Sequence, residues 1–281
     1  MNLLTMMDFK KIIQDNLEND FEQDLFNAAF EGLSLKTKFK FAYFALCMRE
    51  LTRTIFTRLA ADEEIFECNW YKNEFTDGKK GVTRKQRMLY AIKGGLSDDF
   101  VSNNLGIDTD GITKQIVKSI DNLSKYVHVT QGIYNSDEIE CRKMVIGAIL
   151  SLSEFFISID ECRWQIYSAY EKLIYDKIED VLNNDVVDDI DILATHYSID
   201  YVGIEKLNVD YINYQYLGLT FEGVISVEHQ YGSNRDVKKG DGYRTTSDYP
   251  FKSTIDIGVN EPLEIEIGIN DIEIDTSKHF E

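Results

Sequence analysis

The first two thirds of the chain carry apolar residues at intervals of three and four, the spacing that places them on one face of a helix. One such stripe covers residues 7–33 and predicts a helix that stops near Gly32, with Ser34 suited to cap the next one. The next helix is expected from about Lys36 to Ala60. It is apolar on most of its sides, which is typical of a helix inside a bundle.

The helical pattern breaks from Asp62 to Gly81, where Trp70 lies among polar residues and is expected to plug the end of a core. A further helix is predicted over residues 83–93. Gly94 and Gly95 follow it directly, and glycine at that place is a common helix stop.

Residues 96–127 fit two alternatives. Their rhythm is that of a helix-turn-helix that reads DNA, and it also fits two helices packed around a short turn. In either case the second helix begins with Asp108 and Asp110, and DNA phosphates would repel carboxylates at that position. Core packing around the turn is therefore the favoured interpretation.

A long helix is predicted from about Asp137 to Leu182. Its apolar residues continue for so many turns that the sequence indicates either a break near Ser158–Asp160 or one uninterrupted helix along the helical half. The composition changes near Asn183, and the residues that follow it are acidic and ambiguous.

Beyond Tyr211 the spacing of apolar residues becomes two, which predicts strands with one buried face. The segment LEIEIGINDIEI, residues 263–274, shows this alternation most clearly. The expected fold class is therefore α+β. An all-α helical bundle is expected in residues 1–182, and a small antiparallel β-rich, sandwich-like domain in residues 183–281.

The chain is acidic, with 49 Asp and Glu against 30 Lys and Arg and a formal net charge of -19 at pH 7. Such a surface repels nucleic acid at long range, so contact with nucleic acid needs a local basic patch. Cations do gather between residues 49 and 93. The alternative is that the acidity serves solubility alone.

The first residues, MNLLTMMDFKK, carry charge too early for a signal peptide, and no apolar run reaches the length of a membrane span. A cytoplasmic protein without membrane contact is therefore expected. The four cysteines, at positions 47, 68, 141 and 162, lie far apart and lack the close pairs typical of zinc sites. They are expected to be buried thiols.

Several motifs of nucleotide and ester chemistry are missing from the sequence. It has neither GxxxxGK[ST] nor GxGxxG, and it lacks the GxSxG elbow of many hydrolases. Residues 232–242 are rich in Asn, Asp and Gly, but their spacing differs from that of a calcium loop, so a long hairpin or a binding loop is expected there.

The catalytic candidates are His128, Arg49 and Arg53. The two arginines are four residues apart and share one face of their helix. A histidine can move the proton of a ribose 2′-hydroxyl while an arginine stabilises the negative phosphorane. The alternatives are a structural histidine near a helix end and arginines held in surface ion pairs.

Three further cations, Arg84, Lys85 and Arg87, are the candidates for holding backbone phosphates. Cleavage by histidine is expected to need no cofactor. A magnesium-dependent alternative uses Glu222 and Glu228, which would face the same side of a regular strand and hold one ion. The competing interpretation of these two residues is an exposed acidic strand face.

A family resemblance rests on four stretches of the helical half: RELTRTIFTRLA, NWYKNE, GVTRKQRMLYAIKGGLSDDFV and NLSKYVHVTQGIY. They resemble the predicted pPIWI-associating nucleases, which are encoded near prokaryotic Argonaute-like proteins and in other phage-defence settings. The segment VEHQYGSNRDVKKGDG…SDYPF looks like the C-terminal part of the same family. The resemblance runs from about Phe39 to the end of the chain and implies nuclease activity.

The helical half is also similar, more loosely, to the HEPN class of all-α ribonucleases, with one departure. HEPN enzymes carry an arginine four to six residues before the histidine, and none of the four histidines here has one; Asn122 lies six residues before His128.

Together the resemblance and the candidate residues favour an anti-phage nuclease that acts on nucleic acid, RNA in preference to DNA. Another defence-system protein and a second copy of the chain are the candidate protein partners. The alternative is a non-enzymatic sensor or adaptor that binds a phage product, a nucleotide signal or a partner protein.

Overall fold

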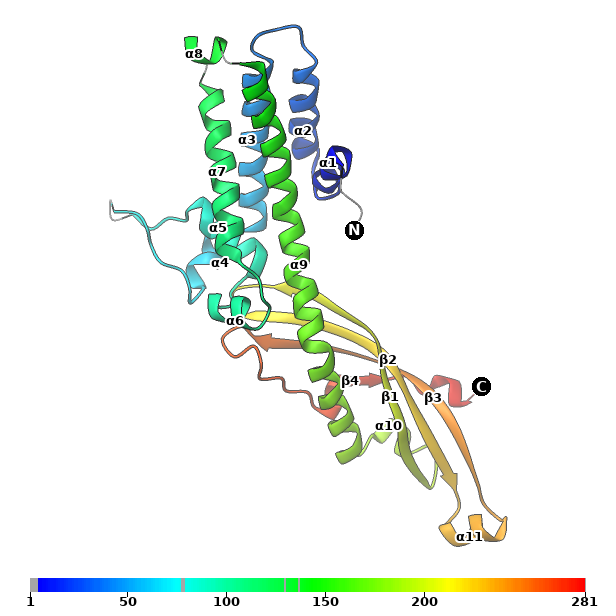
Figure 1. The fold of residues 1–281 in the computed structure, drawn as a ribbon. Coiled ribbons are helices and arrows are strands. Elements are labelled where there is room, and N and C mark those ends of the chain that lie inside the picture. The colour runs from blue at the N-terminus through cyan, green and yellow to red at the C-terminus, as the bar shows by residue number, and fades with distance from the viewer. Residues whose placement is uncertain (1–4, 77–78, 129, 136, 281) are drawn as a thin grey trace. The chain divides into compact units, whose positions relative to one another are not determined.

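The computed structural model describes residues 5–76, 79–128, 130–135 and 137–280. The chain divides into two compact units, residues 1–162 and residues 163–281. The first is helical and the second contains an antiparallel sheet (Figure 1), so the expected α+β class is confirmed. The expected division into domains at residue 182 stays a prediction.

The helices and strands follow one another in this order: α1 (Met6–Asp15), α2 (Asp20–Leu33), α3 (Lys40–Leu59), α4 (Asp62–Glu67), α5 (Arg84–Lys93), α6 (Asp98–Asn103), α7 (Thr109–Val127), α8 (Gln131–Tyr134), α9 (Glu138–Asn184), α10 (Asp188–Asp191), β1 (His196–Ile212), β2 (Tyr216–Tyr231), α11 (Asn234–Lys239), β3 (Tyr243–Gly258), η1 (Ile269–Asp271), β4 (Ile272–Ile274) and η2 (Ser277–Phe280).

Two helices, α1 and α2, occupy the place of the single helix expected over residues 7–33, so that expectation is wrong. The Asn16 side-chain amide donates to the Ile12 carbonyl at 2.9 Å. The Asn19 side-chain oxygen accepts from the backbone N–H of Glu22 at 2.9 Å and caps α2. Asparagine satisfies orphan backbone groups at helix ends better than it continues a helix, which explains the break inside an unbroken apolar stripe.

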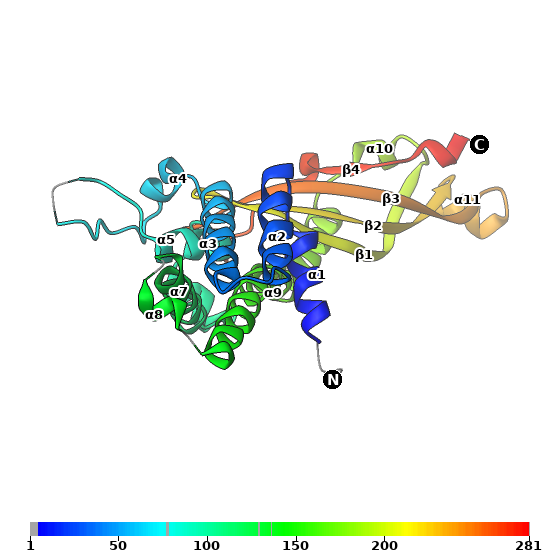
Figure 2. The same ribbon diagram turned by 90° about the horizontal axis from the view of Figure 1, so that it is seen from above.

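The first unit is a bundle in which α2, α3, α7 and the first part of α9 lie side by side (Figures 1 and 2). Phe30 of α2 packs edge-on against Phe44 of α3, with ring centroids 5.7 Å apart. Phe56 of α3 packs against Phe155 of α9 at 4.9 Å. The expected apolar character of α3 therefore reflects its position between neighbours on several sides.

Helix α5 forms where the sequence predicts it. Thr83 caps its start in a reciprocal arrangement with Gln86, and Gly94 ends it with φ +55°, a conformation that favours glycine. The half-buried Trp70 donates from its indole N–H to the Gly94 carbonyl at 2.9 Å. Trp70 thus closes the C-terminal end of α5, while the short helix α4 forms at the start of the segment in which the helical pattern breaks.

Helices α6 and α7 confirm the interpretation of residues 96–127 as core packing. Phe100, Leu105 and Ile107 around the turn are buried. Asp108 accepts a hydrogen bond from the Gly111 backbone at 2.9 Å and caps α7, which accounts for an acid at this position without any contact to DNA.

Helix α9 is uninterrupted over 47 residues. Ser158, where a break was one of two expectations, is helical, and its hydroxyl donates to the Glu154 carbonyl at 2.6 Å. Such a bond to the carbonyl four residues back satisfies the serine without opening the helix.

In the second unit, the described strands form one antiparallel sheet in the order β1-β2-β3-β4. The β-rich expectation is confirmed, but the strands do not form the two layers of a sandwich. A helix supplies the facing apolar surface: Ile166, Tyr170, Ile174 and Ile178 of α9, spaced by four, are fully buried, and each isoleucine contributes roughly 2 kcal/mol by its burial. The Tyr170 hydroxyl also donates to the Pro262 carbonyl.

The segment 263–274 is a strand only at Ile272–Ile274, so the expected longer strand is wrong. Ile265 and Ile267 are buried while the glutamates beside them are exposed. The alternation of apolar and acidic residues therefore reflects burial of one side of this segment, most of which does not pair with β3.

The four cysteines are buried free thiols, as expected. Each helix in the described part of the chain is too short or too polar to span a lipid bilayer.

Candidate functional site

Helix α3 brings Arg49 and Arg53 to the same side, as their spacing predicts, and Glu50 bridges them. The Arg49 guanidinium lies 3.2 Å from one Glu50 carboxylate oxygen, and Arg53 Nε lies 2.8 Å from the other. The Arg53 side chain is 70% exposed, whereas that of Arg49 is 32% exposed. An ion pair of an exposed arginine holds the side chain weakly, so the Arg53 guanidinium can turn to an incoming anion, while Arg49 is more enclosed.

Helix α5 adds two cations from its first turn, Arg84 and Arg87. Arg84 lies 3.3 Å from a carboxylate oxygen of Asp121 on α7. Arg87 is held more firmly, because its guanidinium donates to the Ala60 carbonyl at 2.6 Å and pairs with Asp62.

These four arginines converge on one pocket of about 100 Å³ between α3, α5 and α7, called here the arginine pocket. Its lining residues are Arg49, Thr52, Arg53, Phe56, Thr57, Arg84, Arg87 and Ile120. Three carboxylates hold the four cations, so one positive charge remains in a chain of net charge -19. The pocket is smaller than the roughly 300 Å³ at which small-molecule sites begin, and it suits one phosphate group better than a whole nucleotide.

Two of the six predicted residues are not among the lining residues of the arginine pocket. Lys85 reaches Asp110 at 2.6 Å, and this contact holds the pKa of the Asp110 carboxyl below its ordinary value. His128 is exposed at the C-terminal end of α7. It lies eight residues beyond Ile120, about 12 Å farther along the helix axis. The catalytic role of His128 with Arg49 and Arg53 stays a prediction.

A second basic cavity, of about 550 Å³, lies where α7 ends and α3 begins, and Tyr126 of α7 lines it two residues before His128. We call it the lysine pocket; its lining residues are Leu35, Lys36, Thr37, Lys38, Lys40, Phe41, Ala42, Tyr126, Tyr134, Asn135, Glu138 and Cys141. The Lys38 ammonium lies 4.3 Å from the centre of the Tyr134 ring. Tyr134 is 44% exposed and its face can stack on a nucleic-acid base.

Sequence reasoning missed the lysine pocket, although a signal was present. The run KTKFKF at residues 36–41 places cations at alternate positions with aromatic residues between and after them. Basic residues interleaved with aromatic ones are typical of surfaces that bind single-stranded nucleic acid.

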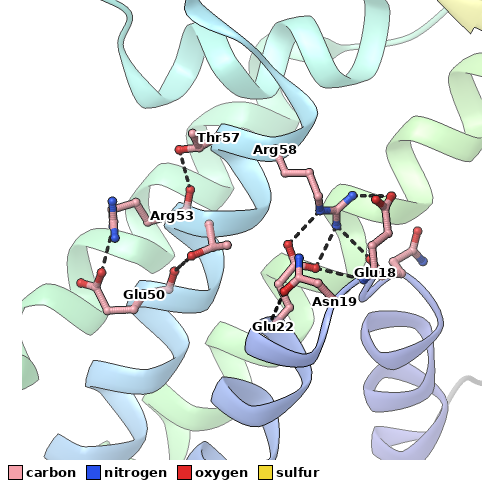
Figure 3. A network of polar contacts seen from close by, with 9 residues as sticks. Glu18, Asn19, Glu22, Glu50, Arg53, Thr57 and Arg58 are labelled. Carbon is pink, nitrogen blue, oxygen red and sulfur yellow. Dashed lines mark hydrogen bonds and ion pairs between the residues drawn. The ribbon is translucent and has the colours of Figure 1, made fainter.

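Arg58, the third arginine of α3, has a different task (Figure 3). It points away from Arg53 and donates to the two carboxylate oxygens of Glu22 at 2.8 and 3.1 Å. The Glu22 side chain is fully buried. Burial alone would raise the pKa of Glu22, but the hydrogen bonds led by that of Arg58 hold it below its ordinary value. Arg58 is therefore a structural residue that ties α3 to α2.

The magnesium alternative with Glu222 and Glu228 is wrong in its geometry. Both residues lie on β2, which pairs with β3 without any shift of register. Six residues of a regular strand span about 20 Å, whereas ligands of one ion lie about 2 Å from it. Each glutamate pairs instead with a cation of β3, Lys252 at 3.8 Å and Arg244 at 3.0 Å. Within the described residues, no group of three or more His, Cys, Asp or Glu side chains is arranged to hold a metal ion.

Comparison with protein families places this chain in a class of predicted nucleases. Two family models match the chain, each described as "Predicted pPIWI-associating nuclease", one over residues 14–152 and the other over residues 159–280. The chain belongs to this family, which confirms the resemblance. The first match contains every residue of the arginine and lysine pockets. A search of curated proteins found no match, and a search of solved structures found none either.

Proposed function

We propose that this protein is a cytoplasmic anti-phage nuclease that grips the backbone of nucleic acid in the arginine pocket and prefers RNA to DNA. The observation that carries the proposal is that four arginine side chains, from two helices, line one pocket in a strongly acidic chain. Guanidinium groups present planar pairs of N–H donors that match phosphate oxygens, which is why arginine recurs where phosphate is bound.

The lysine pocket would take the neighbouring nucleotide of the same strand. Helices α3 and α7 line both pockets, with Ile120 in one and Tyr126 in the other, so the two sites are about 9 Å apart along α7. Stacking on Tyr134 with lysines at the backbone binds single strands without reading their sequence.

His128 would transfer the proton in cleavage. Histidine is the side chain most often used for this task, and the place of His128 at the end of α7, close to the lysine pocket, leaves it open to solvent. Attack by a ribose 2′-hydroxyl needs such a base, and DNA lacks this hydroxyl, which is the reason for favouring RNA. The β-rich unit would bind another protein of the defence system.

The test is cleavage of labelled single-stranded RNA and DNA by the pure protein, with magnesium or with EDTA. The proposal expects RNA cleavage that persists in EDTA and is abolished in His128→Ala. His196→Ala, which changes an exposed histidine of β1, is the matched control and should cleave as the native protein does. Cleavage retained in His128→Ala would remove His128 from the mechanism.

One observation favours the second candidate, a sensor or adaptor without enzymatic activity. Arginine side chains only donate hydrogen bonds, so the four arginines of the arginine pocket can bind an anion but cannot take up a proton as a general base does. Salt-sensitive binding of RNA without cleavage in either buffer would favour this candidate.

A further inference from the structure

The two edges of the sheet differ in how they are protected. Edge strand β1 shifts its register against β2 three times, between Ile199 and Tyr201, Ile204 and Lys206, and Val209 and Tyr211. The extra residue at each shift is acidic: Asp200, Glu205 and Asp210. Bulges and charges on an edge are the means by which proteins prevent other strands from pairing there.

Strand β3 shows the opposite features at the other edge. All sixteen of its residues pair with β2 without a shift, and β4 covers it only over Phe251–Ser253. The Pro250 carbonyl points outward, since it accepts from the Asp275 N–H at 2.9 Å. Successive residues of a strand direct their backbone N–H and C=O groups to opposite sides. The groups of Arg244, Thr246 and Asp248, which lie an even number of residues from Pro250, therefore point outward too.

These outward groups meet solvent. Residues 243–246 and Asp248 are exposed, and no described residue forms a backbone hydrogen bond to the outer side of Arg244, Thr246 or Asp248. The segment therefore offers three evenly spaced donor and acceptor pairs on a regular edge, with threonine and serine between its charges.

The order of side chains on this edge, Arg-Thr-Thr-Ser-Asp, is complementary to itself when reversed. We propose that β3 pairs with the β3 strand of a second copy of this chain, antiparallel about a two-fold axis at Thr246, and so joins two sheets into one. Thr246 then faces its own counterpart, and Arg244 faces Asp248 of the partner subunit at both ends.

Register, hydrogen bonding and charge agree on this one arrangement. The N–H and C=O groups of Arg244, Thr246 and Asp248 all point toward the partner strand. Each of the three facing pairs therefore exchanges two backbone hydrogen bonds, roughly six in total. Pairing shifted by two residues would place Arg244 opposite Thr246 and leave the charges unmatched. In the single chain the Arg244 guanidinium is bound to β2, to Glu228 and Gln230 at 3.0 Å each, and it turns across the outer edge toward Asp248 of the partner subunit when the two copies pair.

Analytical ultracentrifugation of the full chain over a concentration series tests the proposal. The native protein should form dimers. Thr246→Pro removes the two central N–H donors of the dimer, one from each copy. The Thr246 N–H points away from β2, so the native sheet does not need it. Pro250, an even number of residues along the same strand, shows that β3 accepts proline where the N–H would point outward. Thr246→Pro should be monomeric. Gly258→Pro removes an outward N–H of β3 beyond the segments that pair with β4 or with the second copy, and this variant should dimerise as the native protein does.

The charge pair provides an independent test of register. Arg244→Asp alone or Asp248→Arg alone places like charges opposite each other at two symmetric sites, and each should raise the dimer Kd at least tenfold. The double variant Arg244→Asp/Asp248→Arg restores opposite charges and should recover most of the affinity. A monomeric native protein, or a dimer that neither Thr246→Pro nor the single charge changes weaken, overturns the proposal.

Discussion

Removing the guanidinium of Arg58 should destabilise the helical unit severely. Arg58→Met leaves the Glu22 carboxylate fully buried and without its guanidinium partner. The Glu22 Oε2 atom still accepts from the Glu18 backbone N–H at 3.1 Å. Breaking a buried pair in this way costs about 3–5 kcal/mol, and the lower end applies because the Arg58 side chain is 20% exposed. For a unit of this size, about 3 kcal/mol corresponds to a fall in Tm of roughly 6–12 °C.

The matched control lies on the same helix. Arg53→Met also breaks an ion pair, with Glu50 at 2.8 Å, but the Arg53 side chain is 70% exposed, so the expected loss is below about 1 kcal/mol. The assay is thermal unfolding of the full chain, followed by circular dichroism at a helix wavelength.

A second variant separates burial of charge from loss of packing. Arg58→Met/Glu22→Leu removes both charges, and most of the lost stability should return because no uncompensated carboxylate is left in the core. The reasoning is refuted if Arg53→Met lowers Tm as much as Arg58→Met does, or if the double variant is no more stable than Arg58→Met alone.

Three further predictions concern positions outside the two pockets. Asp108→Ala removes the cap that accepts from Gly111 and should lower the free energy of unfolding by about 1 kcal/mol in urea titration. Trp70→Phe loses the 2.9 Å hydrogen bond to Gly94 and should cost a similar amount, about 1 kcal/mol, in the same titration. Burial, and then the charge of His279, lowers the pKa of His229 from 6.5. The stability that the neutral imidazole contributes is therefore full above pH 6.5 and falls as the pH drops below it. Thermal melts over a pH series should show this fall in the native protein and lose it in His229→Gln.

The sequence predicted those features that depend only on residues close together along the chain. The spacing of four residues placed Arg49 and Arg53 on one side of α3 because the helical period alone decides this. Gly94 predicted the C-terminal end of α5, because glycine readily adopts the conformation that stops a helix. The alternation beyond Tyr211 predicted β2 and β3, since one face of the sheet is buried, whereas β1 lies almost entirely before Tyr211 and was not predicted.

Other features depend on local hydrogen bonds that compete with the helical pattern, or on packing between elements. The apolar stripe continues across residues 16–19, and only the local bonds of Asn16 and Asn19 divide α1 from α2. The arrangement of α5 beside α3, which brings Arg84 and Arg87 to the arginine pocket, is tertiary and has no periodic signal. For the same reason the sequence did not separate Arg58, which serves stability, from its neighbours on α3.

The central claim is that guanidinium groups from two helices grip one phosphate, and salt-dependent binding tests it most directly. Arg53 and Arg84 suit the test because their side chains are 70% and 54% exposed, so the fold should tolerate glutamine at both. The measurement is the affinity for labelled single-stranded RNA over a series of salt concentrations, for the native protein, Arg53→Gln/Arg84→Gln, and the control Arg235→Gln on α11.

The account predicts that the double variant binds at least tenfold more weakly at low salt. It also predicts that the slope of log affinity against log salt becomes shallower by about 0.7 for the phosphate contact that is lost. Arg235→Gln should match the native protein in both respects. Equal affinity and slope in the native protein and the double variant would contradict the claim that the arginine pocket binds phosphate.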